Sequence, residues 1–123
     1  MRKLRVLVID DKSIVGDLFD FTLGYAGHDV VCFDDVAAAL KAVEEEKFDI
    51  AFVDIIMPEM DGVTLMSNIK KINADIPIVM MTGFSVEAKR KEMRDLGAVA
   101  CLQKPFELED VQKLIKVVLD RKI

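Results

Sequence analysis

The segment Leu4–Asp11, LRVLVIDD, places a short apolar run directly before two carboxylates. A run of this length, rich in Val and Ile, is typical of a β-strand that is buried on both faces. The first run covers Leu4–Ile9, and four similar runs follow it along the chain: Asp29–Phe33, Phe48–Val53, Ile76–Met81 and Val99–Leu102. We therefore predict five buried strands.

The segments that follow these strands have apolar residues every three or four positions, which predicts one core-facing stripe on each of five helices. The stripes are Ile14, Leu18 and Phe21; Val36, Leu40 and Val43; Leu65, Ile69 and Ile72; Val86, Met93 and Leu96; and Val111, Leu114, Ile115 and Val118. Candidate N-caps are Asp35 and Ser85, and Gly27 and Gly97 suit helix C-termini. Strands that alternate with helices over short connections predict a doubly wound α/β domain with a parallel sheet.

The length and composition exclude several classes of protein. A chain of 123 residues, 52% hydrophobic and 32% charged, is expected to form one globular domain. Its apolar runs are far shorter than the roughly 20 residues that span a membrane, and the first ends in acids, unlike a signal peptide. We therefore expect a cytoplasmic protein. The net charge of −5 disfavours direct binding to nucleic acid.

Two cysteines and one histidine limit the available chemistry. They cannot form the usual four-ligand zinc site, and most catalytic schemes that need histidine are excluded. Any metal must then be held by oxygen. The histidine, His28, falls between the first helix and the second strand, at the end of the sheet opposite the acidic residues. We expect it to be a solvated turn residue.

Ligands of such sheets bind outside the carboxyl ends of the strands. The residues found there are Asp10 and Asp11 after the first strand, Asp54 after the third, Thr82 and Gly83 after the fourth, and Lys104 and Pro105 after the fifth. We expect three carboxylates, a hydroxyl and an ammonium group to converge on one rim.

One aspartate after a strand is a common turn residue or helix cap, but three carboxylates from two strands repel one another. At roughly 5 Å and an effective dielectric constant of ~20, each pair costs ~3 kcal/mol. A hard divalent cation relieves this repulsion, and Mg²⁺ suits carboxylates combined with waters and phosphate oxygens. Asp54 could then attack a phosphoryl group whose charge is balanced by the metal and Lys104, while Thr82 donates a hydrogen bond to it.

The segments VLVIDDKS, VDIIMPEMDG, VMMTGF and LQKPF, in this order and spacing, resemble the receiver domain of two-component response regulators. The resemblance extends over essentially the whole chain, so residues 1–123 would form one receiver domain, either alone or as part of a longer regulator. It implies a flavodoxin-like fold of five helices around a sheet with strand order 2-1-3-4-5. In that order the two cysteines, Cys32 and Cys101, lie on opposite edge strands and cannot form a disulfide.

The resemblance also implies the roles of the acidic residues. Asp54 would accept a phosphoryl group, Asp11 would bind Mg²⁺ directly, and Asp10 would bind it mainly through water. The backbone carbonyl of Ile56 would complete the protein ligands of the metal.

After the fifth strand, Lys104 would pair with the phosphoryl group. The peptide bond between Lys104 and Pro105 is usually cis in the family. Thr82, after the fourth strand, would be the switch hydroxyl. Three residues before Lys104 the family usually has an aromatic side chain that moves with the threonine, but this chain has Cys101. Either the output is carried by loop and helix movement alone, or another ring substitutes, with Phe84 the nearest candidate. The apolar Ile56 and Phe84 predict a comparatively long-lived acyl phosphate.

The resemblance implies a sensor histidine kinase or phosphotransfer protein as phosphodonor, and a downstream protein or attached output domain as target. The chain would be a monomer or a weak phosphorylation-dependent dimer, without a substrate that it turns over as an enzyme. The alternative is a degenerate receiver that acts as a phosphorylation-independent interaction module.

Overall fold

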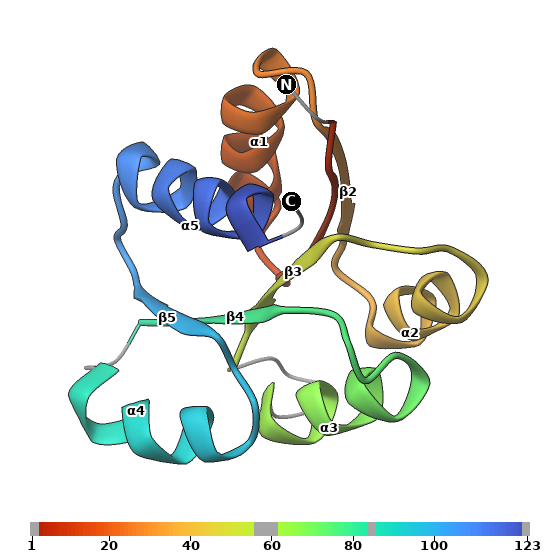
Figure 1. Ribbon diagram of the computed structural model, residues 1–123, viewed down its shortest axis with the longest axis vertical. Coiled ribbons are helices and arrows are strands. Elements are labelled where there is room, and N and C mark those ends of the chain that lie inside the picture. Colours follow the sequence, from red (N-terminus) through yellow and green to blue (C-terminus); the bar gives the residue numbers. More distant parts are fainter. Residues whose placement is uncertain (1–2, 56–61, 84–85, 122–123) are drawn as a thin grey trace.

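The computed structural model describes residues 3–55, 62–83 and 86–121, and its core is a five-stranded parallel sheet (Figure 1). The strand order is β2-β1-β3-β4-β5, as expected from the resemblance. The strands are β1 (Arg5–Ile9), β2 (Asp29–Phe33), β3 (Ile50–Asp54), β4 (Ile78–Thr82) and β5 (Ala100–Gln103). All five predicted strands are present, and four of them begin one or two residues later than predicted.

Helices cover both faces of the sheet. They are α1 (Ser13–Phe19), which continues as the π-helical turn η1 (Asp20–Gly24), then α2 (Val36–Glu45), α3 (Gly62–Ile72), α4 (Val86–Asp95) and α5 (Leu108–Arg121). Figure 1 shows α1 and α5 together on one side and α2, α3 and α4 on the other. The doubly wound α/β fold is therefore confirmed. Among the helices of the described residues, none is long and apolar enough to cross a membrane.

Alternate strand residues supply two separate cores. Leu7 and Val53 belong to the core beneath α2, α3 and α4, whereas Val8 and Phe52 belong to the core beneath α1 and α5. In the second core the Phe19 ring lies 4.6 Å from the Phe52 ring, centroid to centroid. Because every strand interior is apolar on both faces, the sheet has no polar interior position, and polar side chains are left to the strand ends.

The predicted stripe on α1 faces the wrong way. Ile14 and Phe21 are 73% and 63% exposed, whereas Phe19 and Leu23 are buried in the core. The physical reason lies at Gly16, where a Cβ would lie only 3.0 Å from the Sγ of Cys32 on β2. The helix packs closely against β2 at this glycine, so the face of the helix that contains Gly16 turns toward the sheet.

The Cys32 thiol takes part in this contact. Burial raises the pKa of Cys32 to about 11, and the protonated Sγ donates a hydrogen bond to the carbonyl oxygen of Gly16 at 3.6 Å. Cys32 and Cys101 lie on opposite edge strands, as the predicted strand order implied, and no disulfide joins them.

The helix ends largely agree with the sequence. The Asp35 side chain accepts a hydrogen bond from the Ala37 amide at 3.0 Å and caps α2, and Gly27 and Gly97 have positive φ angles of 92° and 103°. Ser85 lies outside the described residues. The stripes of α2 and α5 are confirmed, but Ile72 and Leu96 are partly exposed at the ends of α3 and α4.

The prediction for His28 is wrong. The side chain is only 6% exposed, and its Nδ1 accepts a hydrogen bond from the Leu4 amide at 2.9 Å. A turn between a helix and a strand is usually solvated, but this one folds back against the beginning of β1.

The start of α3 depends on the absence of a side chain at Gly62. A Cβ there would lie 2.8 Å from the Cβ of Ile55 and 3.0 Å from its carbonyl carbon, and the Gly62 amide donates to the Ile55 carbonyl oxygen at 2.8 Å. We expect Gly62→Ala to lower the free energy of unfolding by about 2 kcal/mol, because backbone cannot move aside as a side-chain tip can.

Gly24→Ala is the matched control, since a Cβ at residue 24 would lie 3.8 Å from the nearest atom. It should be neutral or slightly stabilising. Urea unfolding measures both variants, and equal stabilities of the two would contradict the close approach at Gly62.

Candidate functional site

The carboxyl ends of four strands bring the predicted polar residues to one rim. In the parallel register Ile9 pairs with Val53, Asp54 with Met81 and Thr82 with Gln103, so the residues that follow these pairs lie at similar heights. Asp10, Asp54, Thr82 and Lys104 are the last residues of the strands or the first residues after them.

Three carboxylates meet at this rim. Asp10, Asp11 and Asp54 each place one carboxylate oxygen within 4.8 Å of the others, so these acids lie together as predicted. Asp10 and Asp54 are buried, whereas Asp11 is more exposed. This group offers only oxygen ligands, which is the donor set that hard divalent cations prefer.

Lys104 enters the same group from the other end of the rim. Its Nζ donates to Asp10 Oδ2 at 2.7 Å and to Asp54 Oδ2 at 3.4 Å. Burial by itself lowers the pKa of Lys104, but the hydrogen bonds and charges of Asp10 and Asp54 outweigh it and raise that pKa above its usual value. Lys104 is therefore an ammonium ion at neutral pH, and the peptide bond to Pro105 is cis, as the resemblance implied.

Asp10 is held in place by backbone as well as by Lys104. Its Oδ1 accepts a hydrogen bond from the Lys12 amide at 2.9 Å, and its own amide donates to the Phe33 carbonyl at 3.1 Å. Sequence reasoning did not identify this preference of Lys104 for Asp10. The positions of the strand ends show that Asp10, Asp54 and Lys104 share a rim. They do not show which of the two carboxylates lies closer to the ammonium group.

Two other predictions concern residues at the margins of the site. Thr82 is fully buried at the end of β4. Ile56, the predicted carbonyl ligand, and Phe84, the candidate replacement ring, lie outside the described residues. Cys101 is half-buried and its thiol donates to the Sδ of Met93 on α4 at 3.3 Å. The residue at the usual aromatic position therefore links β5 to α4 through two sulfur atoms.

Comparison with known proteins agrees with this arrangement. Residues 6–116 match the family model of the response regulator receiver domain. This match covers most of the chain, and the chain therefore belongs to the receiver domain family of two-component response regulators.

Individual relatives differ in length. The response regulator receiver protein CpdR of Brucella abortus is 33% identical over 94% of this chain and 96% of its own length. The transcriptional regulatory protein FixJ of Bradyrhizobium diazoefficiens is 36% identical over 93% of this chain, but over only 56% of its own length. The chain likewise spans about half of PhoP of Bacillus subtilis, at 49% of that protein. A CheY-like receiver domain protein from Methanospirillum hungatei has a similar structure, with a TM-score of 0.89 at 28% identity over 98% of this chain and 96% of that one.

The geometry of the rim predicts different effects for its acids when no cation is added. Asp11→Asn removes one of three crowded charges and leaves the pair of Asp10 and Lys104 intact, so it should stabilise the fold by about 1 kcal/mol after solvent screening. Asp10→Asn removes a like charge but also weakens the bond to Lys104, and it should stabilise the fold less or destabilise it.

Thermal unfolding with a chelator present measures both variants, with Asp75→Asn, an exposed acid that precedes β4 at the opposite end of the sheet, as the control. A larger gain for Asp10→Asn than for Asp11→Asn would contradict the arrangement of charges described above.

Proposed function

We propose that this chain accepts a phosphoryl group on Asp54 from a phosphohistidine of a sensor histidine kinase or phosphotransfer protein. The observation that carries the proposal is the position of Asp54, a buried carboxylate with two further carboxylates and the ammonium group of Lys104 beside it. A buried carboxylate beside two others is unfavourable for the fold, because each like charge opposes its ionisation, so its presence indicates a function. Acceptance of a phosphoryl group is a function that requires such a carboxylate.

The transfer follows from the groups present. An oxygen of Asp54 attacks phosphorus, the phosphorus–nitrogen bond of the donor breaks, and the imidazole leaves with the bonding electrons and takes a proton from solvent. Lys104 offers positive charge 3.4 Å from Asp54, where negative charge gathers on the transferring oxygens. Thr82, at the end of the neighbouring strand, would donate a hydrogen bond from its hydroxyl group to a phosphoryl oxygen. Hydrolysis of the acyl phosphate ends the signal, and we propose no substrate that is turned over.

The donor set at the rim fits Mg²⁺. Asp10, Asp11 and Asp54 would hold it through oxygen, with the Ile56 carbonyl as the further ligand that the resemblance implies. Mg²⁺ supplies positive charge to the phosphoryl oxygens when it is bound.

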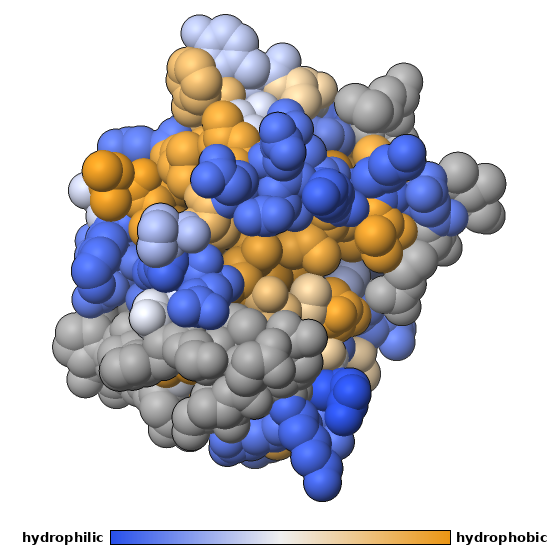
Figure 2. All heavy atoms as spheres, turned by 90° about the vertical axis from the view of Figure 1, so that its left-hand side faces the viewer, coloured by the Kyte–Doolittle hydropathy of each residue, from blue (hydrophilic) through white to orange (hydrophobic). Residues whose placement is uncertain are grey.

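Output would pass through the surface around α4, β5 and α5. Figure 2 shows apolar side chains gathered on this side of the molecule. Leu96 and Val99, between α4 and β5, and Val117, on α5, are exposed apolar residues. A surface pocket of about 310 Å³ lies beside Cys101, lined also by Arg94 and Val99. We propose that phosphorylation changes how this surface binds a downstream protein or an attached output domain. A degenerate, phosphorylation-independent module is less favoured, because Asp54 and Lys104 are both in place.

Phosphorylation itself is tested with a small-molecule phosphodonor and Mg²⁺. The parent protein should gain the mass of one phosphoryl group in intact-mass spectrometry, and Asp54→Asn should gain none. Asp75→Asn should behave as the parent does, since it removes an exposed acid that precedes β4, at the end of the sheet opposite the rim. Retention of the phosphoryl group by Asp54→Asn would overturn the assignment.

The outward face of α1, and of the η1 turn that continues it, suggests where the phosphodonor docks. Ile14, Leu18, Phe21 and Tyr25 follow one another at the spacing of residues that pack helix against helix. Tyr25 is 84% exposed, and its ring centroid lies 5.2 Å from that of Phe21. The stripe begins three residues after Asp11, at the rim that the donor phosphohistidine must reach. A helix of the phosphodonor that packs along this stripe would therefore bring its histidine toward Asp54.

This docking is tested by Phe21→Ser, which removes apolar surface without touching the rim. Transfer from a purified phosphotransfer protein that phosphorylates the parent should slow at least severalfold, while phosphorylation by the small-molecule donor should be unchanged. Val117→Ser, an exposed apolar residue on α5, is the matched control and should change neither rate. Equal transfer rates for Phe21→Ser and the parent would exclude this face.

A further inference from the structure

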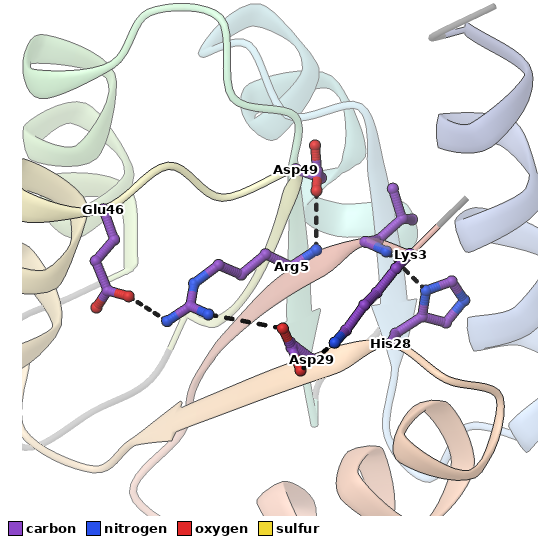
Figure 3. A network of polar contacts seen from close by, with 7 residues as sticks. Lys3, Arg5, His28, Asp29, Glu46 and Asp49 are labelled. Carbon is purple, nitrogen blue, oxygen red and sulfur yellow. Dashed lines mark hydrogen bonds and ion pairs between the residues drawn. The ribbon is translucent and has the colours of Figure 1, made fainter.

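The end of the sheet opposite the rim contains a polar network built around the beginning of β1 (Figure 3). His28, in the turn before β2, lies against this strand and is almost fully buried. Its backbone amide donates to the Leu23 carbonyl at the end of η1, at 3.0 Å, and its Nδ1 accepts from the Leu4 amide at 2.9 Å. One residue thus joins the end of the first helix to the start of the first strand.

The contact extends the pairing of β1 and β2 by one bond. The ladder begins at Arg5 opposite Asp29, and the Asp29 amide donates to the Leu4 carbonyl at 2.9 Å. The Leu4 amide points the same way as the ladder bonds but has the imidazole of His28 as its acceptor. Leu4 itself is fully buried in the core beneath α1 and α5.

An acceptor Nδ1 carries no proton, so the bond requires the neutral imidazole with its hydrogen on Nε2. A second proton would place one N–H group against another in a buried position, which costs the hydrogen bond and leaves the Leu4 amide without its acceptor. We propose that His28 is a proton-sensitive cap on β1, through which mild acid loosens the end of the sheet remote from the phosphoacceptor.

The charged groups around the cap are already engaged. Asp49, before β3, accepts from the Arg5 amide at 2.8 Å, and Lys3 lies 3.3 Å from Asp29. The Arg5 guanidinium pairs with Glu46 at the end of α2 and lies within 3.8 Å of Asp29. These acids already have cationic or amide partners, and of their charges that of Asp49 favours an imidazolium at this position.

Burial lowers the pKa of His28 below its ordinary value of 6.5, although the charge of Asp49 opposes this effect. Above that value both the folded and the unfolded chain hold a neutral imidazole, and the cap is fully stabilising. As the pH falls through 6.5 toward the lower folded value, the unfolded chain binds a proton that the folded chain rejects, so stability falls. His28 is the one histidine of the sequence, so no other imidazole titrates in this range.

The tautomer can be read directly by NMR of the full chain. The long-range nitrogen–proton spectrum at neutral pH should show the Nε2–H tautomer, and titration should give a pKa below 6.5. A proton on Nδ1, or a pKa at or above the ordinary value, would overturn the proposal.

The effect on the fold is tested by thermal unfolding at about pH 7.5 and about pH 5.5. The parent Tm should fall by at most about 5 °C, because one pH unit below 6.5 proton binding by the unfolded chain shifts the unfolding equilibrium at most about tenfold. His28→Asn keeps an acceptor atom near the position of Nδ1 but does not titrate, so its Tm should fall less. An equal fall in the parent and in His28→Asn would overturn the proposal, because the acid sensitivity would then come from other groups.

Discussion

The ion pair between Lys104 and Asp10 is the interaction on which the candidate site depends. It joins residues 94 positions apart in the sequence, and it connects the edge strand β5 with β1, although β3 and β4 lie between them. Lys104 can make this contact because its backbone amide donates to the Thr82 carbonyl, which keeps the chain after β5 against the end of β4. The ammonium group then reaches over two strand ends to the acids. Without this internal cation, three carboxylates would face one another across a buried rim.

Lys104 also explains why the fold tolerates three acids at one rim. Its charge offsets part of the repulsion among the three acids, while its shared position between Asp10 and Asp54 leaves it ready to pair with new negative charge. Lys12 also lies 3.6 Å from Asp11, and two cations among three acids still leave an excess of negative charge. That excess favours a divalent cation, and the combined positive charge of that cation and Lys104 then favours a phosphoryl group. In the phosphorylation proposed above, the same residues would serve stability before the transfer and charge balance during it.

The fold and the residues of the rim could be predicted from sequence, because both follow from the spacing of apolar residues and from the alternation of strands and helices along the chain. Buried parallel strands are apolar throughout, so their ends are marked by the first polar residues, and parallel order places those residues at one edge. The direction of α1 could not be predicted in this way, since its sequence has two apolar stripes. A glycine in contact with Cys32 on β2 decides between them, and that contact is between residues distant in sequence. His28 was misjudged for a similar reason, because its acceptor role depends on an amide 24 positions away.

The two ends of the sheet handle charge in opposite ways. At the amino end, Lys3 and Arg5 are matched by acids, and the Arg5 guanidinium also lies 5.4 Å from the centre of the Phe48 ring. Charges there are paired within the chain, which helps to hold the strand ends together. At the carboxyl end, acids outnumber the cation that joins them. Because both ends belong to the same acidic chain, its net charge does not explain this difference. The imbalance is specific to the rim among the described residues, and a divalent cation bound there would relieve it.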